Sequence, residues 1–356
     1  MRDAFLAINT HAGYLVKNLK KLGHKAFYID NYNKNSLEKI SKRHFLNKFI
    51  ETIQNKHSLI KLIYGSGLED KKSIFKLLES KTTIQGNNLN TLEYCNNILN
   101  LEKELKKSGL KIPKTNRTPL NNNIKSITKP FSSSGGLGIK FFKSIKKGHY
   151  YQEFIPGPTF SVSFFITRKK FFLLGYNKLF HLKGFHKNPF IHAGAMNIPK
   201  IEKSEEIEKS VKNFSSIMGL RGYNSIDFKI FNNEIFVLDV NPRITSTFKI
   251  YNELYSNDLL RLQIGLENKK GIFMKKSLRK FYGFVYVFSN KKFKFFKDME
   301  NDKIISDLPI NGEIIEKDSP VFTINCSASS PSSVVKLLRK EINTAKKNYN
   351  CYDIDI

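Results

Sequence analysis

Short apolar segments alternate with amphipathic ones over the first 85 residues of the chain. The runs of strand length cover residues 4–8, 25–29 and 59–64, and the stretches with helical apolar spacing cover residues 12–22 and 71–79. A strand followed by a helix, repeated along the chain, is typical of an open α/β sheet. We therefore predict an N-terminal α/β unit, with a tight strand-to-helix turn at Gly65-Ser-Gly67.

The pattern becomes less regular after residue 85. Residues 87–109 have helical spacing and end at Ser-Gly, which predicts one long helix. Further segments with strand patterns cover residues 124–129, 159–166, 283–288 and 292–296, and a helical pattern covers residues 332–347. We expect this part of the chain to form α+β units.

Two alternating apolar segments, residues 222–227 and 237–245, carry polar side chains where they end. Asp227 ends the first segment, and Asp239, Asn241 and Arg243 follow at every second position of the other. Residues two apart in a strand share a face. The intervening residues 231–234 include two Asn, which tolerate positive φ in a hairpin turn. An antiparallel return would place Asp227 beside Asp239.

These oxygen ligands next to a guanidinium suit a divalent cation bound to a nucleotide polyphosphate. Carboxylate and amide oxygens bind Mg²⁺, and Arg binds phosphate oxygens. The alternative is that Asn241-Pro-Arg243 merely ends an edge strand with a turn. The hairpin alone leaves both readings open.

A loop rich in Ser and Gly follows Lys129-Pro. It contains Ser132, Ser133, Ser134, Gly135, Gly136 and Gly138 between two predicted strands. Backbone amides of such a loop can surround phosphate oxygens, and Lys129 at its base adds a positive charge. A flexible hairpin or linker is the alternative, but the position of Lys129 favours phosphate binding.

Downstream of this loop, the segment Gln152-Glu-Phe-Ile-Pro-Gly157 precedes another alternating strand. Exposed backbone groups beside an apolar wall are what an adenine ring requires. An ordinary β-hairpin accounts for the apolar residues but not for the order of the three segments.

Composition narrows the class of protein. The chain has 356 residues, of which 40% are hydrophobic, so it can bury a large core. No apolar run has the length of a membrane helix, and the N-terminal apolar segment lacks a cleavage-type sequence, so we expect a cytoplasmic protein. Cys95, Cys326 and Cys351 lie far apart without a Cys-x-x-Cys pair, which supports neither disulfides nor a cysteine-rich zinc site.

The net charge of +29 would ordinarily suggest a nucleic-acid partner. Only nine of the 60 basic residues are Arg, and the Lys residues are spread over the whole chain. No zinc finger, RNP signature or basic zipper is present. We therefore expect no specific nucleic-acid partner and attribute the Lys content to a compositional bias of the source genome.

The ordered motifs resemble those of the ATP-grasp superfamily, in the branch of predicted ATP-dependent carboligases related to biotin carboxylase. The resemblance runs nearly from end to end. Besides the segments above, it rests on Tyr64-Gly-Ser-Gly-Leu-Glu69, Gln85-Gly-Asn87, Phe190-Ile-His-Ala-Gly-Ala195, Asp307-Leu-Pro and Ser319-Pro-Val-Phe-Thr323. Each motif is weak alone, but their shared order is specific.

The resemblance implies an ATP-grasp fold with a Rossmann-like, pre-ATP-grasp N-terminal α/β domain. The implied units cover residues 1–85, 86–157 (with the Gly/Ser loop), 158–270 (with the metal site) and 271–356 (an α+β extension). ATP would lie between the second and third units.

The resemblance also implies a role for each site residue. Lys129 and Arg243 would be catalytic, with Lys129 on ATP phosphate and Arg243 on the transferred phosphoryl group. Asp227, Asp239 and Asn241 would hold Mg²⁺ or Mn²⁺. The residues that would bind ATP are Lys129, Ser132, Ser133, Ser134, Gly135, Gly136, Gly138, Gln152, Glu153, Phe154 and Ile155.

Three features depart from the superfamily pattern or find no place in it. Position 239 is Asp where Glu is usual, which makes bridging of two ions less certain. The second ATP-binding Lys has no clear counterpart, with Lys103 and Lys106 as candidates. His181, His186 and His192 fit no standard zinc spacing, and we expect them in a loop, with His192 near the substrate.

The implied activity is carboxylate-amine ligation through an acylphosphate, with ATP converted to ADP and phosphate. The partners would be a small-molecule carboxylate and an amine, with coenzyme biosynthesis as one setting suggested by relatives of this branch. Alternatives are an ATP-grasp carboxylase, a phosphotransferase, and a non-catalytic nucleotide-binding or nucleic-acid-binding protein. The sequence carries neither the identity of the substrates nor the oligomeric state.

Overall fold

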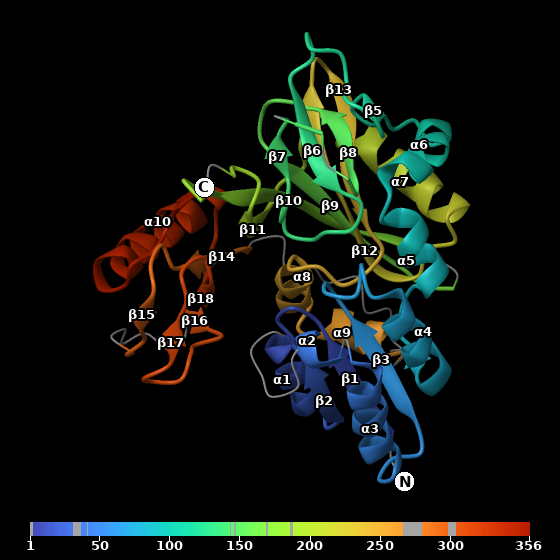
Figure 1. The fold of residues 1–356 in the computed structure, drawn as a ribbon, viewed down its shortest axis with the longest axis vertical. Helices are drawn as coiled ribbons and strands as arrows, with labels where there is room; N and C mark the ends of the chain where they lie inside the picture. The colour runs from blue at the N-terminus through green and yellow to red at the C-terminus, as the bar shows by residue number, and fades with distance from the viewer. Residues whose placement is uncertain are drawn as a thin grey trace.

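The N-terminal part of the chain is a parallel sheet flanked by helices. A computed structural model describes residues 3–30, 37–40, 42–142, 144–145, 147–168, 170–185, 188–265, 280–297 and 304–356. The four strands have the order β2-β1-β3-β4 and run parallel. The elements of this part are β1 (Ala4–Ile8), α1 (Gly13–Lys21), β2 (Lys25–Ile29), α2 (Leu37–Ile40), α3 (Arg43–Gln54), β3 (Ile60–Tyr64), α4 (Lys72–Lys81) and β4 (Thr83–Ile84). The predicted open α/β unit is confirmed, and it lies at the bottom of Figure 1.

Two helices replace the single helix predicted for residues 87–109. They are α5 (Leu89–Cys95) and α6 (Ile98–Lys107). The side chain of Asn88 accepts a hydrogen bond from Thr91 N, and that of Asn97 accepts one from Leu99 N, so each helix has its own N-cap. The prediction of one helix was wrong because Asn97 begins a new helix within a continuous apolar pattern.

A small antiparallel sheet carries the Gly/Ser loop. Its strand order is β5-β8-β6-β7. The strands are β5 (Thr115–Asn116), β6 (Ser126–Pro130), β7 (Lys140–Phe141) and β8 (His149–Glu153). The loop joins β6 to β7, so both of its ends are fixed by neighbouring strands.

A nine-stranded sheet forms the centre of the molecule. Its main path is β13-β12-β9-β10-β11-β14-β18-β16, and β19 pairs with β10. The elements from the middle of the chain are β9 (Phe160–Ile166), β10 (Phe171–Lys183), β11 (His192–Ile198), α7 (Ser204–Ile217), β12 (Gly222–Phe231), β13 (Glu234–Asn241), α8 (Phe248–Leu254) and α9 (Asp258–Gln263). Side chains of α5, α6 and α7 pack against those of β9, β12 and β13. These helices lie on the right side of Figure 1.

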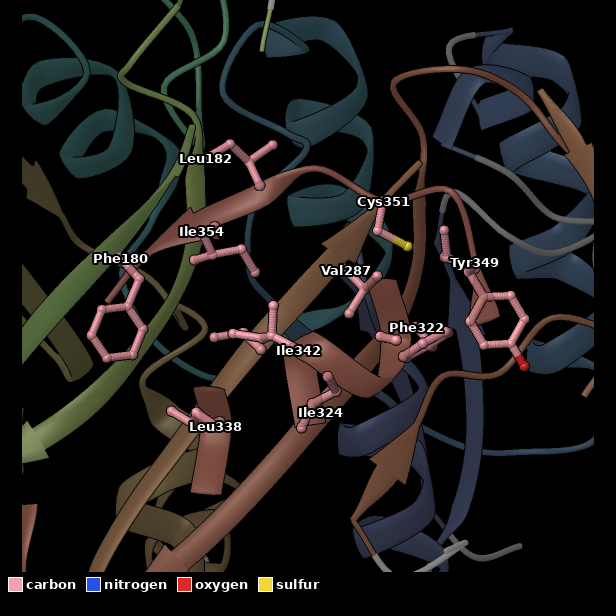
Figure 2. Packing of buried hydrophobic residues seen from close by; sticks show 14 of the residues in the cluster. Phe180, Leu182, Val287, Phe322, Ile324, Leu338, Ile342, Tyr349, Cys351 and Ile354 are labelled. Carbon is pink, nitrogen blue, oxygen red and sulfur yellow. The ribbon is translucent and has the colours of Figure 1, made fainter. Parts of the chain in front are cut away.

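The C-terminal strands extend the same sheet, apart from two that form a separate two-stranded sheet. The C-terminal elements are β14 (Phe281–Phe288), β15 (Phe293–Lys294), β16 (Ile305–Ser306), β17 (Ile314–Ile315), β18 (Pro320–Ala328), α10 (Pro331–Asn348) and β19 (Asp353–Asp355). Figure 2 shows α10 packing Leu338 and Ile342 toward Ile324 of β18 and Phe180 of β10. The predicted strands and helix of this region are confirmed, apart from small shifts at their ends.

The domain boundaries given above stay predictions. The boundary between residues 270 and 271 lies outside the described residues. Within the described part of the chain, no helix is long and apolar enough to cross a membrane.

Candidate functional site

One cavity of about 940 Å³ receives side chains from the small sheet, the central sheet and the N-terminal unit. It is lined by thirteen of the residues that the sequence assigned to the site. Ser132 and Gly138 are not among the lining residues. The three separate sequence segments with candidate chemistry are therefore brought to one place.

The hairpin of β12 and β13 forms one wall of this cavity. Asn232 and Asn233 have φ values of 48° and 60°, as a tight turn between paired strands requires. Asp227 lies opposite Asp239, as predicted. The register shifts beside this pair and leaves Leu238 as an extra residue in β13, which is a β-bulge. No residue pattern along the chain predicts this bulge.

Burial raises the pKa of both carboxyl groups of the hairpin. Withdrawal from water, together with the neighbouring Asp239, raises the pKa of Asp227 to about 7, although Arg243 and Lys129 oppose the shift. Burial also raises the pKa of Asp239. Asn241 donates from Nδ2 to Asp227 Oδ2 at 3.3 Å, which directs its own carbonyl oxygen elsewhere.

Lys129 of β6 reaches across to the bulge. Its Nζ donates to the carbonyl oxygen of Leu238 at 2.8 Å. Burial alone would lower the pKa of Lys129, but Tyr150, Asp239 and Asp227 outweigh it, and the pKa is raised. This ammonium therefore stays charged beside the two carboxyl groups.

Arg243 is held by a residue that the sequence did not assign to the site. Its Nη2 lies 2.8 Å from Oε1 of Glu69, and both side chains are more than nine-tenths buried. Glu69 also accepts from the backbone of Gly67 through Oε2 at 2.6 Å. Glu69 belongs to the sequence motif at residues 64–69, but nothing in that motif indicates that Arg243 is its partner.

The Gly/Ser loop rests on the segment before β11. Gly135, Gly136 and Gly138 have φ of 64°, 79° and 76°. His192 N donates to Gly135 O at 2.9 Å. A Cβ atom at Gly136 would lie 1.8 Å from Phe190 O, so only glycine fits there. Residues 133–137 of the loop and Lys129 line the same cavity.

Phe154 and Ile155 also line the cavity, together with several polar groups. Phe154 lies between two ammonium groups, 4.9 Å from Lys125 Nζ and 5.2 Å from Lys229 Nζ, each measured to the ring centroid. Lys229 donates to Ile155 O at 2.8 Å. Gln152 Nε2 donates to Thr115 Oγ1, whereas its buried Oε1 has no hydrogen-bond partner among the described residues. A ligand amino group would satisfy that oxygen.

Two expectations about the additional Lys and His candidates were wrong. Lys103 and Lys106 lie on the exposed face of α6 and do not line the cavity, because the apolar face of this helix packs on the central sheet. His181 lies in β10 and His192 in β11, where they are neighbours across the strands rather than loop residues. Both line the cavity, and His186 lies outside the described residues.

A divalent cation fits the hairpin only together with further oxygen ligands. Within the described residues, no three Asp, Glu, His or Cys side chains come together as a metal site. Asp227, Asp239 and the amide of Asn241 supply hard oxygen donors, and nucleotide phosphates would supply the rest. The donor set therefore fits a nucleotide-bound Mg²⁺ better than a cation held by protein alone.

Comparison with known proteins agrees with this geometry. Residues 95–247 match the ATP-grasp domain family. An uncharacterised protein of Methanocaldococcus jannaschii is 27% identical over 91% of this chain and 88% of its own length. Tyramine–L-glutamate ligase of the same organism is 31% identical over 49% of this chain and 51% of its own length.

The fold match extends over nearly the whole chain. The biotin carboxylase domain of Hydrogenobacter thermophilus 2-oxoglutarate carboxylase superposes with a TM-score of 0.72 at 13% identity. The match covers 98% of this chain and 90% of that one. The predicted ATP-grasp fold with its N-terminal α/β part is confirmed.

Proposed function

We propose, from the ATP-grasp domain that this chain carries, that the protein is an ATP-dependent carboxylate-amine ligase acting through an acylphosphate. One observation carries the proposal. Two carboxyl groups, an amide, an ammonium and a guanidinium line one cavity together with the apolar side chains of Phe154 and Ile155. ATP likewise combines a charged polyphosphate with a flat, largely apolar ring.

ATP would lie along the cavity with its adenine at Gln152, Glu153, Phe154 and Ile155. The phosphates would pass under residues 132–138 toward Lys129 and Arg243. The orphaned Gln152 Oε1 would accept from the exocyclic amino group. Asp227, Asp239 and Asn241 would hold Mg²⁺, which neutralises phosphate charge. The H. thermophilus domain was solved with MgADP, which supports this cofactor.

A substrate carboxylate does not react directly with an amine, because its carbon is a poor electrophile. It is therefore activated by ATP first. Its oxygen attacks the γ-phosphorus, the new O–P bond forms and ADP leaves. An amine then attacks the acyl carbon, and phosphate leaves. Lys129 and Arg243 would stabilise negative charge that develops on the transferred group, and removal of one such charge should cost about 3 kcal/mol of transition-state stabilisation.

The relatives support ligation over carboxylation or simple phosphotransfer. The name tyramine–L-glutamate ligase describes the joining of an amine to a carboxylate. The alignment covers only about half of each chain, so that enzyme's substrates do not transfer to this one. The relative therefore supports the reaction type and not a particular pair of substrates.

The test is release of ADP by the purified protein with Mg-ATP and a panel of amino acids, amines and dicarboxylates. We expect ADP and phosphate to form only when both a carboxylate and an amine are present. The variant D239N should be inactive while still folded. Formation of AMP, or no turnover with any pair in the panel, would contradict the proposal.

A further inference from the structure

The cavity is also lined by a second group of charged and aromatic side chains. This group, named the far end of the cavity here, consists of His11, Tyr14, Lys249, Tyr286 and Asp307. They come from four regions: the segment after β1, the helix α1, the helix α8, and the C-terminal extension. None of them belongs to the proposed nucleotide site.

The N-terminal sheet explains why this end is open to a ligand. In the strand order β2-β1-β3-β4, the chain connects β1 to β2 on one side and then crosses to β3 on the other side of β1. The direction of the connections therefore reverses between β1 and β3. In open α/β sheets, ligands bind outside the carboxyl ends of the strands at such a point. Thr10 and His11 follow β1, Ser66 follows β3, and all three line the cavity.

Lys249 is a cation without an ion pair. It is half-buried, and its Nζ donates one hydrogen bond, to Ser306 Oγ at 3.3 Å. It also lies over the ring of Tyr14, 5.3 Å from the centroid. An ammonium has three donors, and no carboxylate of the described residues pairs with this one. The nearby Glu253 instead accepts from Tyr14 OH at 2.9 Å.

Asp307 is an anion held in a fixed position. Its Oδ2 accepts from Thr323 Oγ1 at 2.7 Å and from Ser306 Oγ at 3.1 Å. Its backbone is left-handed, with φ of 61°. Asp307 and Thr323 belong to the two C-terminal motifs that the nucleotide site leaves without a role.

The hydroxyl of Ser306 separates these two charges. It accepts from Lys249, donates to Asp307, and is itself held by Asn325 Nδ2 at 3.1 Å. The opposite charges thus face one cavity without contacting each other. A ligand that carries both an anion and a cation a short distance apart would satisfy both.

We propose that this end of the cavity is a zwitterion site that binds a free amino acid, its carboxylate on Lys249 and its ammonium on Asp307. A simple amine would leave Lys249 unpaired, and a dicarboxylate would place an anion against Asp307. The inference rests on the proposed function in that the amino acid would be one of the two ligase substrates. The remaining residues of the far end, His11 and Tyr286, stack with ring centroids 5.0 Å apart and form its wall.

The test compares free amino acids with derivatives that lack one charge. The probes are the twenty standard L-amino acids, the N-acetyl form of each, and the α-amide of each. Binding is measured by thermal shift with Mg²⁺ and a non-hydrolysable ATP analogue present, and ADP release is measured separately with Mg-ATP. We expect one or a few free amino acids to bind, and both derivatives to bind at least tenfold more weakly.

The variants K249M and D307N assign each charge to its residue. K249M should bind the preferred amino acid and its amide equally weakly, because the carboxylate has lost its partner. D307N should bind the free amino acid and its N-acetyl form equally weakly, because the ammonium group has lost its partner. K340M, on the outer face of α10, is the matched control and should behave as the wild type. A purely structural role for Asp307 beside α1 would change stability but not this selectivity.

The outcomes separate the inference from the proposed function. Binding of a free amino acid without ADP release would support the zwitterion site and contradict the ligase. ADP release that depends on simple amines and dicarboxylates alone would support the ligase and overturn the zwitterion site. The inference also fails when no amino acid binds, or when K249M and D307N keep the wild-type selectivity.

Discussion

At the scale of single residues, the pairing of Glu69 with Arg243 has a consequence for catalysis. E69Q keeps the shape of the side chain but removes the charge that fixes the guanidinium. Because breaking a buried ion pair leaves one charge uncompensated, we expect E69Q to lower stability by about 3 kcal/mol and to lower kcat more than the affinity for ATP. Urea unfolding and steady-state kinetics measure the two effects.

The control for this variant is E93Q, which removes an ion pair with Lys72 on the surface. Exposed pairs contribute less than about 1 kcal/mol, so E93Q should resemble the wild type. Equal behaviour of E69Q and E93Q would show that Arg243 needs no partner.

His192 predicts how stability depends on pH. Burial, together with the neighbouring His181, lowers its pKa to about 3. As the pH falls, a histidine whose pKa is depressed in the folded state is protonated in the unfolded state before it is protonated in the folded state. The folded protein therefore loses stability as the pH falls from about 6.5 toward 3. Removing the imidazole in H192N should make the acid loss shallower by up to about 1.4 kcal/mol per pH unit. Urea titrations of both proteins between pH 7 and pH 4 measure the difference, and parallel curves would rule out this role.

At the scale of elements, the Gly/Ser loop offers a matched pair of substitutions. Gly135 and Gly136 both have positive φ, so alanine at either costs about 1–2 kcal/mol of backbone strain. Only at Gly136 would the new Cβ strike Phe190 O, whereas nothing lies within 4 Å at Gly135. G136A should therefore displace the loop and raise the KM for ATP well beyond the effect of G135A. The prediction fails if both variants have the same KM.

The sequence predicted elements that depend on local pattern and missed those that depend on distant partners. The hairpin of Asp227 and Asp239 was predictable because period-two spacing and two Asn residues are local signals. The bulge at Leu238, which presents its carbonyl to Lys129, is set by pairing with β12 and leaves no local mark. The sequence pattern predicted α5 and α6 as one helix, because apolar spacing continues across Asn97. Asn97 is, however, the N-cap of α6 and so marks the beginning of a second helix.

At the scale of the whole molecule, the site is shared by parts of the chain that are far apart in sequence. Arg243 comes from the central sheet and its partner Glu69 from the N-terminal unit, while Asp307 reaches the same cavity from the C-terminal extension. Motif order suggested that these segments belong together. Which side chains meet depends on sheet order and on crossings between units, and no spacing along one chain encodes that.

This sharing predicts that the nucleotide stabilises the molecule as a unit. A ligand that binds only the folded state at 100 times its Kd adds about 2.7 kcal/mol to the free energy of unfolding. Since phosphate oxygens and the hairpin would hold Mg²⁺ jointly, a non-hydrolysable ATP analogue should raise Tm by a few degrees with Mg²⁺ and much less with EDTA. K129M should reduce the Mg²⁺-dependent rise because it removes a charge that faces the phosphates, whereas K340M should keep it in full. A rise in Tm that is equal with Mg²⁺ and with EDTA would mean that Asp227, Asp239 and Asn241 do not hold the ion.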